Sequence, residues 1–413
     1  MEKNIDAAIH WLCETEILNK DKNRASYGGV NNGYIWTKKN YQYVYHEITG
    51  YAVNSFITIY QWTKDEKYLQ YAVKAADYLL SQQKAVNENG FEAGGIWHSL
   101  VHPSLQRVDN YYSFDNAIIL HGLCRLYQIT QEQRYYEACK DIGGFLLKMQ
   151  KENGAFHSYY DAKTKEVKHE SDEFFFDNGC LHVKNAIGLF YLNLISQEEQ
   201  YRQAGIRSCD WGIRLFEKDG LFWANTKKQY VFTHAHCYAT EGYLYAYLFL
   251  NNQKYLDIAR KAGMALIDIQ NPDGSVYRIY KNKLFMKYQY GAKFKMSSKR
   301  WWNEKKHPWK TIDASSQAAR IWILLYSIDK NPRLLEAAQR AIAFLTKNQA
   351  VDTSDRNRDG GYYYQLCDTM AGEEVTLNSG MYTWCTQFSL SALMLFNLVK
   401  SNEKFENLID FLF

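Results

Sequence analysis

The sequence predicts an all-α protein, an (α/α)6 toroid in which six helical hairpins form an inner and an outer ring of helices. Three observations predict this fold: a helix that recurs along the chain, a glycine turn that follows each copy, and an apolar helix that precedes each copy. Recurrence of one helical unit is the signature of a repeat architecture. A repeat architecture also allows a chain of 413 residues to form one domain, residues 1–413. No linker-like Pro, Ser or Gly tract divides the chain.

The recurring helix has five copies that align with one another without gaps. Each is amphipathic with the 3.6-residue period of an α-helix, which places one apolar face against a core. The copies are residues 66–83, 133–150, 199–216, 253–270 and 332–349. The stretch Ile5–Leu18 supplies a sixth helix at the start of the chain.

A turn containing glycine follows each of these helices. Asn-Gly and Asp-Gly accept the positive φ that a helix exit or a tight hairpin needs. The turns are Tyr27-Gly28-Gly29, Asn89-Gly90-Phe91, Asn153-Gly154, Asp219-Gly220, Asp273-Gly274 and Asp359-Gly360. A turn containing glycine therefore follows each of the six amphipathic helices.

The apolar helices ahead of these copies are expected to form the inner ring. They begin near Glu47, Asp115, Asp177, His236, Asp313 and Asn378. Stretches such as 116–127 and 316–326 are small and apolar around most of their circumference, as a helix covered on all sides should be. Pairing the first helix with the last, which runs to about Lys400, closes the ring. An open solenoid is the alternative, against which the absence of polar capping repeats argues.

Composition places the chain among ordinary globular proteins, with 46% hydrophobic and 23% charged residues. A net charge of +4 is small for this length and argues against a nucleic-acid surface. Neither a signal peptide pattern nor a stretch of about 18 uninterrupted apolar residues is present, so we expect a cytoplasmic protein without membrane contact. The eight cysteines form no C-x-x-C pair, which favours buried free thiols in a reducing compartment.

The segments that lead into the inner helices are where function is expected. In a ring these segments gather at one mouth, with the helix N-termini pointing into it. They are rich in His, Asp, Trp and Tyr; aromatic faces stack on sugar rings, and polar side chains bind hydroxyls, so the mixture suits a saccharide pocket. The candidate substrate-binding residues are His46, Glu47, Tyr112, Asn116, Asn178, His182, Glu241, Trp302, Asp313, Arg320, Trp384 and Gln387.

Asp115 and Asp177 are the candidate acid/base pair, because glycosidic chemistry needs carboxylic groups on both sides of the bond. Three phenylalanines, Phe174–Phe176, precede Asp177, and an apolar wall of that kind raises a carboxyl pKa toward the range of a general acid. The alternative is that these aspartates, with Asp313, are helix N-caps.

His234 and His236 are the second catalytic candidates. Two imidazoles at this spacing could be bases for proton abstraction or zinc ligands. Spacing indicates no third ligand, so neither a metal nor a cofactor is predicted.

A basic segment between Lys281 and Lys310 carries ten lysines and arginines interleaved with Trp301, Trp302 and Trp309. It predicts a saccharide substrate that carries a negative charge, the alternative being a solvated charge run. The oligomeric state is not indicated.

The chain resembles the six-hairpin glycosidase superfamily over essentially its whole length. The segment Asp313-Ala314-Ser315-Ser316-Gln317-Ala318-Ala319 is similar to the Asp-Ser-Ser-x-x-Ala motif of unsaturated glucuronyl hydrolases. That resemblance implies that Asp115 and Asp177 act as acid/base and partner in hydrating the vinyl ether of an unsaturated uronate.

His236 followed by Glu241-Gly242-Tyr243-Leu244 also resembles a helix of the N-acylglucosamine 2-epimerases, which use paired histidines. The predicted function is therefore a glycoside hydrolase or lyase acting on an anionic saccharide. The alternatives are a sugar epimerase with paired histidine bases and a non-catalytic glycan-binding protein.

Overall fold

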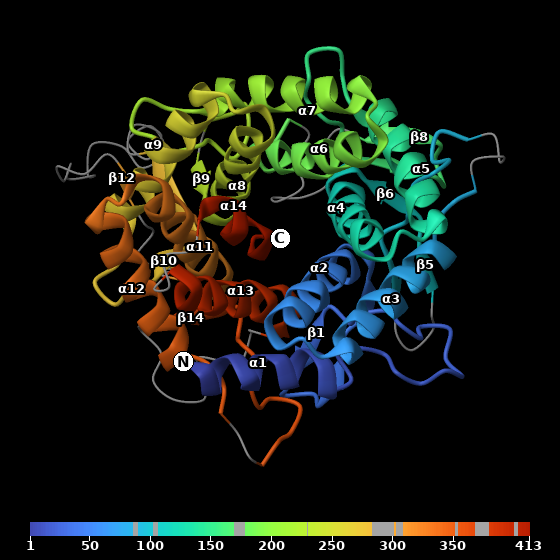
Figure 1. Ribbon diagram of the computed structural model, residues 1–413, viewed down its shortest axis with the longest axis horizontal. Coiled ribbons are helices and arrows are strands. Elements are labelled where there is room, and N and C mark those ends of the chain that lie inside the picture. Colours follow the sequence, from blue (N-terminus) through green and yellow to red (C-terminus); the bar gives the residue numbers. More distant parts are fainter. Residues whose placement is uncertain are drawn as a thin grey trace.

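The computed structural model describes residues 1–85, 90–101, 106–168, 178–228, 230–282, 301–302, 309–351, 354–367, 380–399 and 404–413, with positions 281, 282, 301, 302 and 367 described by their backbone alone. Two concentric rings of helices surround a central axis (Figure 1). The predicted (α/α)6 toroid is confirmed.

The inner ring consists of α2 (His46–Thr63), α4 (Ser113–Thr130), α6 (Asn185–Ser196), α8 (Thr233–Leu250), α11 (Ile312–Asp329) and α13 (Thr383–Val399). The outer ring consists of α1 (Glu2–Glu14), α3 (Glu66–Ser81), α5 (Gln133–Met149), α7 (Glu199–Gly212), α9 (Gln253–Ile269) and α12 (Pro332–Lys347). Short helices flank α6 and α7, namely η1 (Cys180–Lys184) and η2 (Ile213–Leu215). Burial explains why the inner helices are apolar around most of their circumference and the outer helices are amphipathic. Every residue from His46 to Ile59 of α2 is buried, whereas α3 buries only one face.

Contacts between the two ends of the chain close the ring. Helix α1 packs against α13, and β1 (Gly33–Ile35) pairs with β15 (Met381–Tyr382) in an antiparallel register. The Trp11 indole N–H donates to the carbonyl oxygen of Asn357 at 2.8 Å. The predicted pairing of the first helix with the last is therefore confirmed.

Six glycines with φ between +88° and +95° mark the repeat. A Cβ on any of them would overlap a carbonyl oxygen of an outer helix, so a side chain is excluded by both backbone conformation and space. They are Gly28, Gly94, Gly154, Gly220, Gly274 and Gly360. The prediction of Gly90 for the second unit is wrong, because Gly94 is the residue that lies against the carbonyl oxygen of Asp141 in α5.

Short strands at the mouth connect neighbouring hairpins, and the sequence did not predict them. Among the described residues they form five three-stranded sheets, in the orders β15-β1-β2, β10-β13-β14, β12-β11-β9, β3-β4-β5 and β6-β7-β8. Strands β3 (Val44–Tyr45), β6 (Asn110–Tyr112), β9 (Tyr230–Phe232), β13 (Trp309–Thr311) and β15 each lead directly into an inner helix. The remaining strands are β2 (Asn40–Tyr41), β4 (Ser99–Val101), β5 (Gln106–Val108), β7 (Tyr159–Asp161), β8 (Glu166–Lys168), β10 (Val276–Tyr277), β11 (Ile279–Asn282), β12 (Trp301–Trp302) and β14 (Gln365–Cys367).

The segment that contains α14 (Phe405–Leu408) and η5 (Ile409–Phe411) lies near the ring axis (Figure 1). The Tyr245 hydroxyl of α8 donates to the carbonyl oxygens of Ile409, at 3.0 Å, and Leu412, at 2.5 Å. Sequence analysis did not predict this segment. Within the described part of the chain no helix is both long and apolar enough to cross a membrane.

Candidate active site

A cavity of about 420 Å³ lies at the mouth, a volume within the usual range of small-molecule sites. Eight of its sixteen lining residues are aromatic. The lining consists of Asn32, Gln42, Tyr43, Tyr45, Glu47, Ile48, His98, Tyr112, Phe232, His234, Tyr238, Arg278, Asp313, Tyr364, Tyr382 and Trp384. Aromatic walls with a few polar groups suit the faces and hydroxyls of a sugar.

One wall carries an imidazole held by an aspartate. His98 lies just before β4, and its Nδ1 is 3.0 Å from Oδ2 of Asp115 in the first turn of α4. The other carboxylate oxygen of Asp115 accepts from the Tyr45 hydroxyl at 3.3 Å. Asp115 is only 1% exposed, and burial raises its pKa. Asp115 therefore reaches the cavity through His98.

A second imidazole, that of His234 in α8, lies beside an aspartate of α11. The Nδ1 of His234 lies 3.5 Å from Oδ2 of Asp313, which also accepts from the Trp384 indole N–H at 3.3 Å. Burial lowers the pKa of His234, so its imidazole is neutral at pH 7. A neutral imidazole is the form that accepts a proton.

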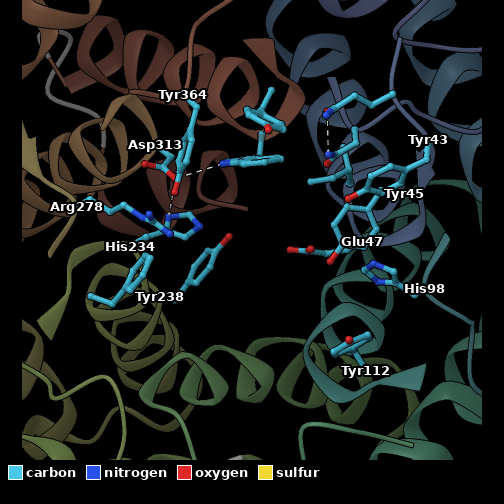
Figure 2. Close-up of a pocket in the computed structure, with 16 residues that line it drawn as sticks. Tyr43, Tyr45, Glu47, His98, Tyr112, His234, Tyr238, Arg278, Asp313 and Tyr364 are labelled. Carbon is cyan, nitrogen blue, oxygen red and sulfur yellow. Dashed lines mark hydrogen bonds and ion pairs between the residues drawn. The ribbon is translucent and has the colours of Figure 1, made fainter. Parts of the chain in front are cut away.

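The two imidazoles stand on opposite sides of the cavity, as Figure 2 shows. Each turns its Nδ1 toward its own aspartate, which leaves the edge that carries Nε2 away from that carboxylate. A carboxylate that accepts the Nδ1 proton fixes the tautomer in which Nε2 is the basic atom. The arrangement can therefore act on a bound molecule from both faces.

Glu47 supplies a carboxyl group on the His98 side, and Figure 2 shows its side chain pointing into the cavity. The residue is 6% exposed. Burial and the negative charge of Asp115 raise the pKa of Glu47 well above its usual range. A protonated carboxyl group at this place can donate a proton.

Arg278 is the one lysine or arginine in the described lining of the cavity, and it lies on the His234 side (Figure 2). Its guanidinium carbon lies 5.0 Å from the centre of the Phe232 ring. Within the described part of the chain its buried Nε has no hydrogen-bond partner. Arg278 can therefore bind an anionic group or a developing negative charge.

A buried ion network lies beneath the cavity. The Glu241 carboxylate contacts Lys184 at 2.7 Å and Arg320 at 2.5 Å, and all three side chains are fully buried. Burial lowers the pKa of Lys184 to about 8. The Lys184 Nζ lies 4.5 Å from the ring centre of Tyr238, a lining residue, and donates to the carbonyl oxygen of Phe413 at 3.2 Å. The network thus connects the cavity lining to the C-terminal segment on the axis.

The structure brings five of the predicted site residues into the cavity lining: Glu47, Tyr112, His234, Asp313 and Trp384. Asp115 lies behind His98, whereas Glu241 and Arg320 belong to the ion network. Asp177 lies outside the described residues, as does the side chain of Trp302.

Three predicted residues form hydrogen bonds to backbone atoms and do not line the cavity. His46 contacts the Trp97 carbonyl oxygen and the Tyr78 hydroxyl, and Asn116 bonds the backbone of Ile96. His236 turns away from the cavity, and its Nδ1 accepts from the backbone N–H of Phe222 at 3.1 Å.

Three further predicted residues also lie apart from the cavity lining. His182 lies beside Asn185, and the side-chain oxygen of Asn178 accepts from Lys151 at 3.1 Å. Gln387 is fully buried in α13.

Most of the basic segment from Lys281 to Lys310 lies outside the described residues. Lys310 is described, and its Nζ pairs with Asp273 at 2.7 Å. Among the described residues no group of three or more His, Cys, Asp or Glu is arranged to hold a metal ion.

Two cavity residues, His98 and Arg278, were not predicted from the sequence, because they follow outer helices α3 and α9 instead of starting an inner helix. The tyrosines of the lining that were not predicted are Tyr43, Tyr45, Tyr238, Tyr364 and Tyr382. A signal for His98 exists, because β4 directly follows it and pairs with β3, which leads into α2. Such two-residue pairings cannot be recognised by periodicity.

The helices and the cavity at their mouth define an (α/α)6 toroid. Solved structures share this fold. A sugar epimerase from a ruminal bacterium matches with a TM-score of 0.73 and 12% identity, over 96% of this chain and 98% of that chain. Cellobiose 2-epimerase from Bacillus thermoamylovorans matches with a TM-score of 0.70 and 15% identity, over 94% of this chain and 98% of that chain. Unsaturated glucuronyl hydrolase from Bacillus sp. GL1 matches with a TM-score of 0.60 and 13% identity, over 95% of this chain and 93% of that chain.

In sequence, the family described as pectic acid lyase matches residues 107–188. No curated protein matches the chain. At such identities the likeness to solved structures establishes the fold, and it confirms the predicted resemblance at that level.

Proposed function

We propose that the chain is a carbohydrate-active enzyme that transfers protons to and from a saccharide bound between His98 and His234. The observation that carries this proposal is the pair of imidazoles on opposite walls, each with an aspartate carboxylate beside its Nδ1. The aromatic lining supports a sugar as the bound molecule. Structures named as sugar epimerase and cellobiose 2-epimerase share the fold, which favours epimerisation.

In this reaction the Nε2 of neutral His234 removes the proton from the sugar carbon next to the carbonyl group, and the C–H electron pair moves into an enolate. In the step that follows, His98 acts in its protonated form, with Nδ1 facing Asp115, and its Nε2–H donates a proton to the opposite face of the same carbon. The product is the epimer, and solvent exchange restores both imidazoles. Arg278 would stabilise the enolate oxygen.

The second candidate is cleavage of an anionic saccharide, by a lyase or a hydrolase. Arg278 supports it, as a partner for a carboxylate, and so does the protonated Glu47, as a donor to a leaving oxygen. The pectic acid lyase match covers Asp115, and an unsaturated glucuronyl hydrolase shares the fold. The acid/base pair proposed from the sequence, Asp115 and Asp177, would act here with Asp115 working through His98. The basic segment would add to anion capture.

Exchange of carbon-bound hydrogen separates these reactions. The protein is incubated in D₂O with a panel of reducing aldoses and disaccharides, and proton NMR follows the signal at C2. Uronate oligosaccharides are followed in parallel by ultraviolet absorbance for unsaturated uronates and by mass spectrometry with a labelled reducing end. Epimerisation predicts deuterium at C2 together with a new epimer. Cleavage without exchange would favour the second candidate, and binding without turnover would favour a glycan-binding protein.

A cytoplasmic location is part of the proposal. It is supported by the seven cysteines whose side chains are described, all of which are buried and free.

A further inference from the structure

We propose that Gln317 is a positioning residue that holds His234 in the tautomer with the proton on Nδ1, so that Nε2 is the proton-accepting atom. The inference rests on the proposed function for its catalytic meaning, although the tautomer itself can be measured without any substrate. Gln317 lies in α11, one helical turn after Asp313, and is fully buried.

Gln317 connects the cavity wall to the ion network. Its Oε1 lies 2.5 Å from Nδ1 of His234, and its Nε2 lies 3.4 Å from Oε1 of Glu241. One side-chain amide therefore contacts both the imidazole and the buried carboxylate.

Glu241 determines which way this amide faces. The Glu241 carboxylate accepts hydrogen bonds from Lys184 and from Arg320, and the oxygen that faces Gln317 is the one that accepts from Arg320. The NH₂ group of Gln317 must therefore face Glu241, because the reversed amide would place two acceptor oxygens together in a buried site. Its oxygen then faces His234 and can only accept, so Nδ1 must carry the proton.

Gln317 is a stronger partner of Nδ1 than Asp313. The carboxylate oxygen of Asp313 lies 3.5 Å from Nδ1, at the limit of a hydrogen bond, and already accepts from Trp384. The charged groups that act on His234 come from three elements: Asp313 of α11, Glu241 of α8 and Lys184 of η1. Negative charge from the two carboxylates favours the imidazolium, while burial and Lys184 oppose it.

The tautomer is measured by long-range ¹H–¹⁵N correlation NMR on protein labelled with ¹⁵N-histidine, with the His234 signals assigned by their loss in His234→Asn. At pH 8 the wild-type protein should show protonated Nδ1 and unprotonated Nε2. Gln317→Met, which has a similar volume and no acceptor, should show a substantial fraction with the proton on Nε2. Wild-type protein protonated at Nε2, or an unchanged tautomer in Gln317→Met, would overturn the inference.

Two further variants control for packing. Gln349→Met removes another buried amide at the ring closure, where Gln349 bonds Asn4 and Gly360, and should leave the tautomer unchanged. Gln317→Leu also removes the acceptor oxygen, so it should likewise show a substantial fraction of His234 with the proton on Nε2. If neither Gln317 variant folds, the tautomer of the wild-type protein carries the test, and a proton on Nε2 there would overturn the inference.

If an active substrate is found, the pH profile gives a readout that a purely structural role would not move. The limb of kcat/KM that requires neutral His234 should shift to lower pH in Gln317→Met, because the hydrogen bond from His234 to Gln317 raises the pKa of His234. Failure to find a substrate would count against the proposed function and leave the tautomer assignment standing.

Discussion

Gly360 lies directly against the carbonyl oxygen of Ala7 in α1, so that a Cβ on Gly360 would overlap this oxygen. Its φ of +95° is also a conformation that residues with a side chain rarely adopt. This contact joins the last glycine turn to the first helix and so helps to close the ring.

We therefore expect Gly360→Ala to lower the free energy of unfolding by about 2 kcal/mol or more, measured by urea denaturation. Gly144 in α5 provides the matched control, because a Cβ there meets no other atom within 4 Å. Gly144→Ala should be neutral or stabilising by about 0.5–1 kcal/mol, since alanine favours the helix. Equal effects of the two substitutions would contradict the role of this contact.

Glu47→Gln should make the protein more stable at neutral and alkaline pH. The folded state raises the pKa of Glu47, so the folded protein binds more protons than the unfolded one above pH 4.5, and stability is lost as pH rises through the folded pKa. Glutamine mimics the protonated carboxyl group and does not titrate. The free energy of unfolding of the variant at high pH should therefore exceed that of the wild-type protein by about 1.4 kcal/mol for each unit by which folding raises the pKa of Glu47. Urea denaturation at pH 4.5 and pH 8 measures the difference. A raised pKa of Glu47 would be contradicted if the variant gained no free energy of unfolding at pH 8, or gained the same amount at both pH values.

Arg278→Met should lower kcat/KM by about 100-fold, the typical cost of losing one preorganised donor to a developing oxyanion. The kinetic constant that changes identifies the partner of Arg278. Loss in kcat with reducing sugars indicates enolate stabilisation, whereas a higher KM confined to uronates indicates carboxylate binding. Unchanged kinetics with both substrate classes would remove Arg278 from the site.

Glu241→Gln should destabilise the protein by about 3–5 kcal/mol, because Lys184 and Arg320 would remain buried without their counter-ion. Thermal unfolding measures this loss. Asp257→Asn is a matched control, since Asp257 forms an exposed pair with Arg260 and pairs of that kind contribute about 0–1 kcal/mol. Comparable losses in the two variants would contradict the burial argument.

Much of the fold could be predicted because helix periodicity and glycine turns are local signals. The five aligned copies predicted outer helices whose observed starts agree, at residues 66, 133, 199, 253 and 332. The strands of two to four residues carry no periodicity, and Gly94 is distinguished from Gly90 only by its contact with Asp141 in another helix. Neither could be predicted from local sequence.

The candidate site was predicted in its location but only partly in its residues. His234 and His236 were paired as catalytic candidates because of their spacing. However, α8 begins at Thr233, and residues two apart on a helix face different directions. His234 therefore lines the cavity while His236 faces Phe222. The second imidazole of the cavity, His98, follows an outer helix, so only the pairing of β3 with β4 brings it to the mouth.

The most direct test of the proposed function is the incorporation of deuterium at C2 of a sugar by the wild-type protein, His98→Asn and His234→Asn. The account predicts incorporation and epimer formation by the wild-type protein, with each substitution lowering the rate of epimer formation by at least about 100-fold, as expected when a general acid or base is removed. His236→Asn, in which the imidazole outside the cavity is replaced, should retain exchange at the wild-type rate per folded molecule. Absence of exchange with every sugar tested, or epimer formation that survives either cavity substitution, would contradict the account.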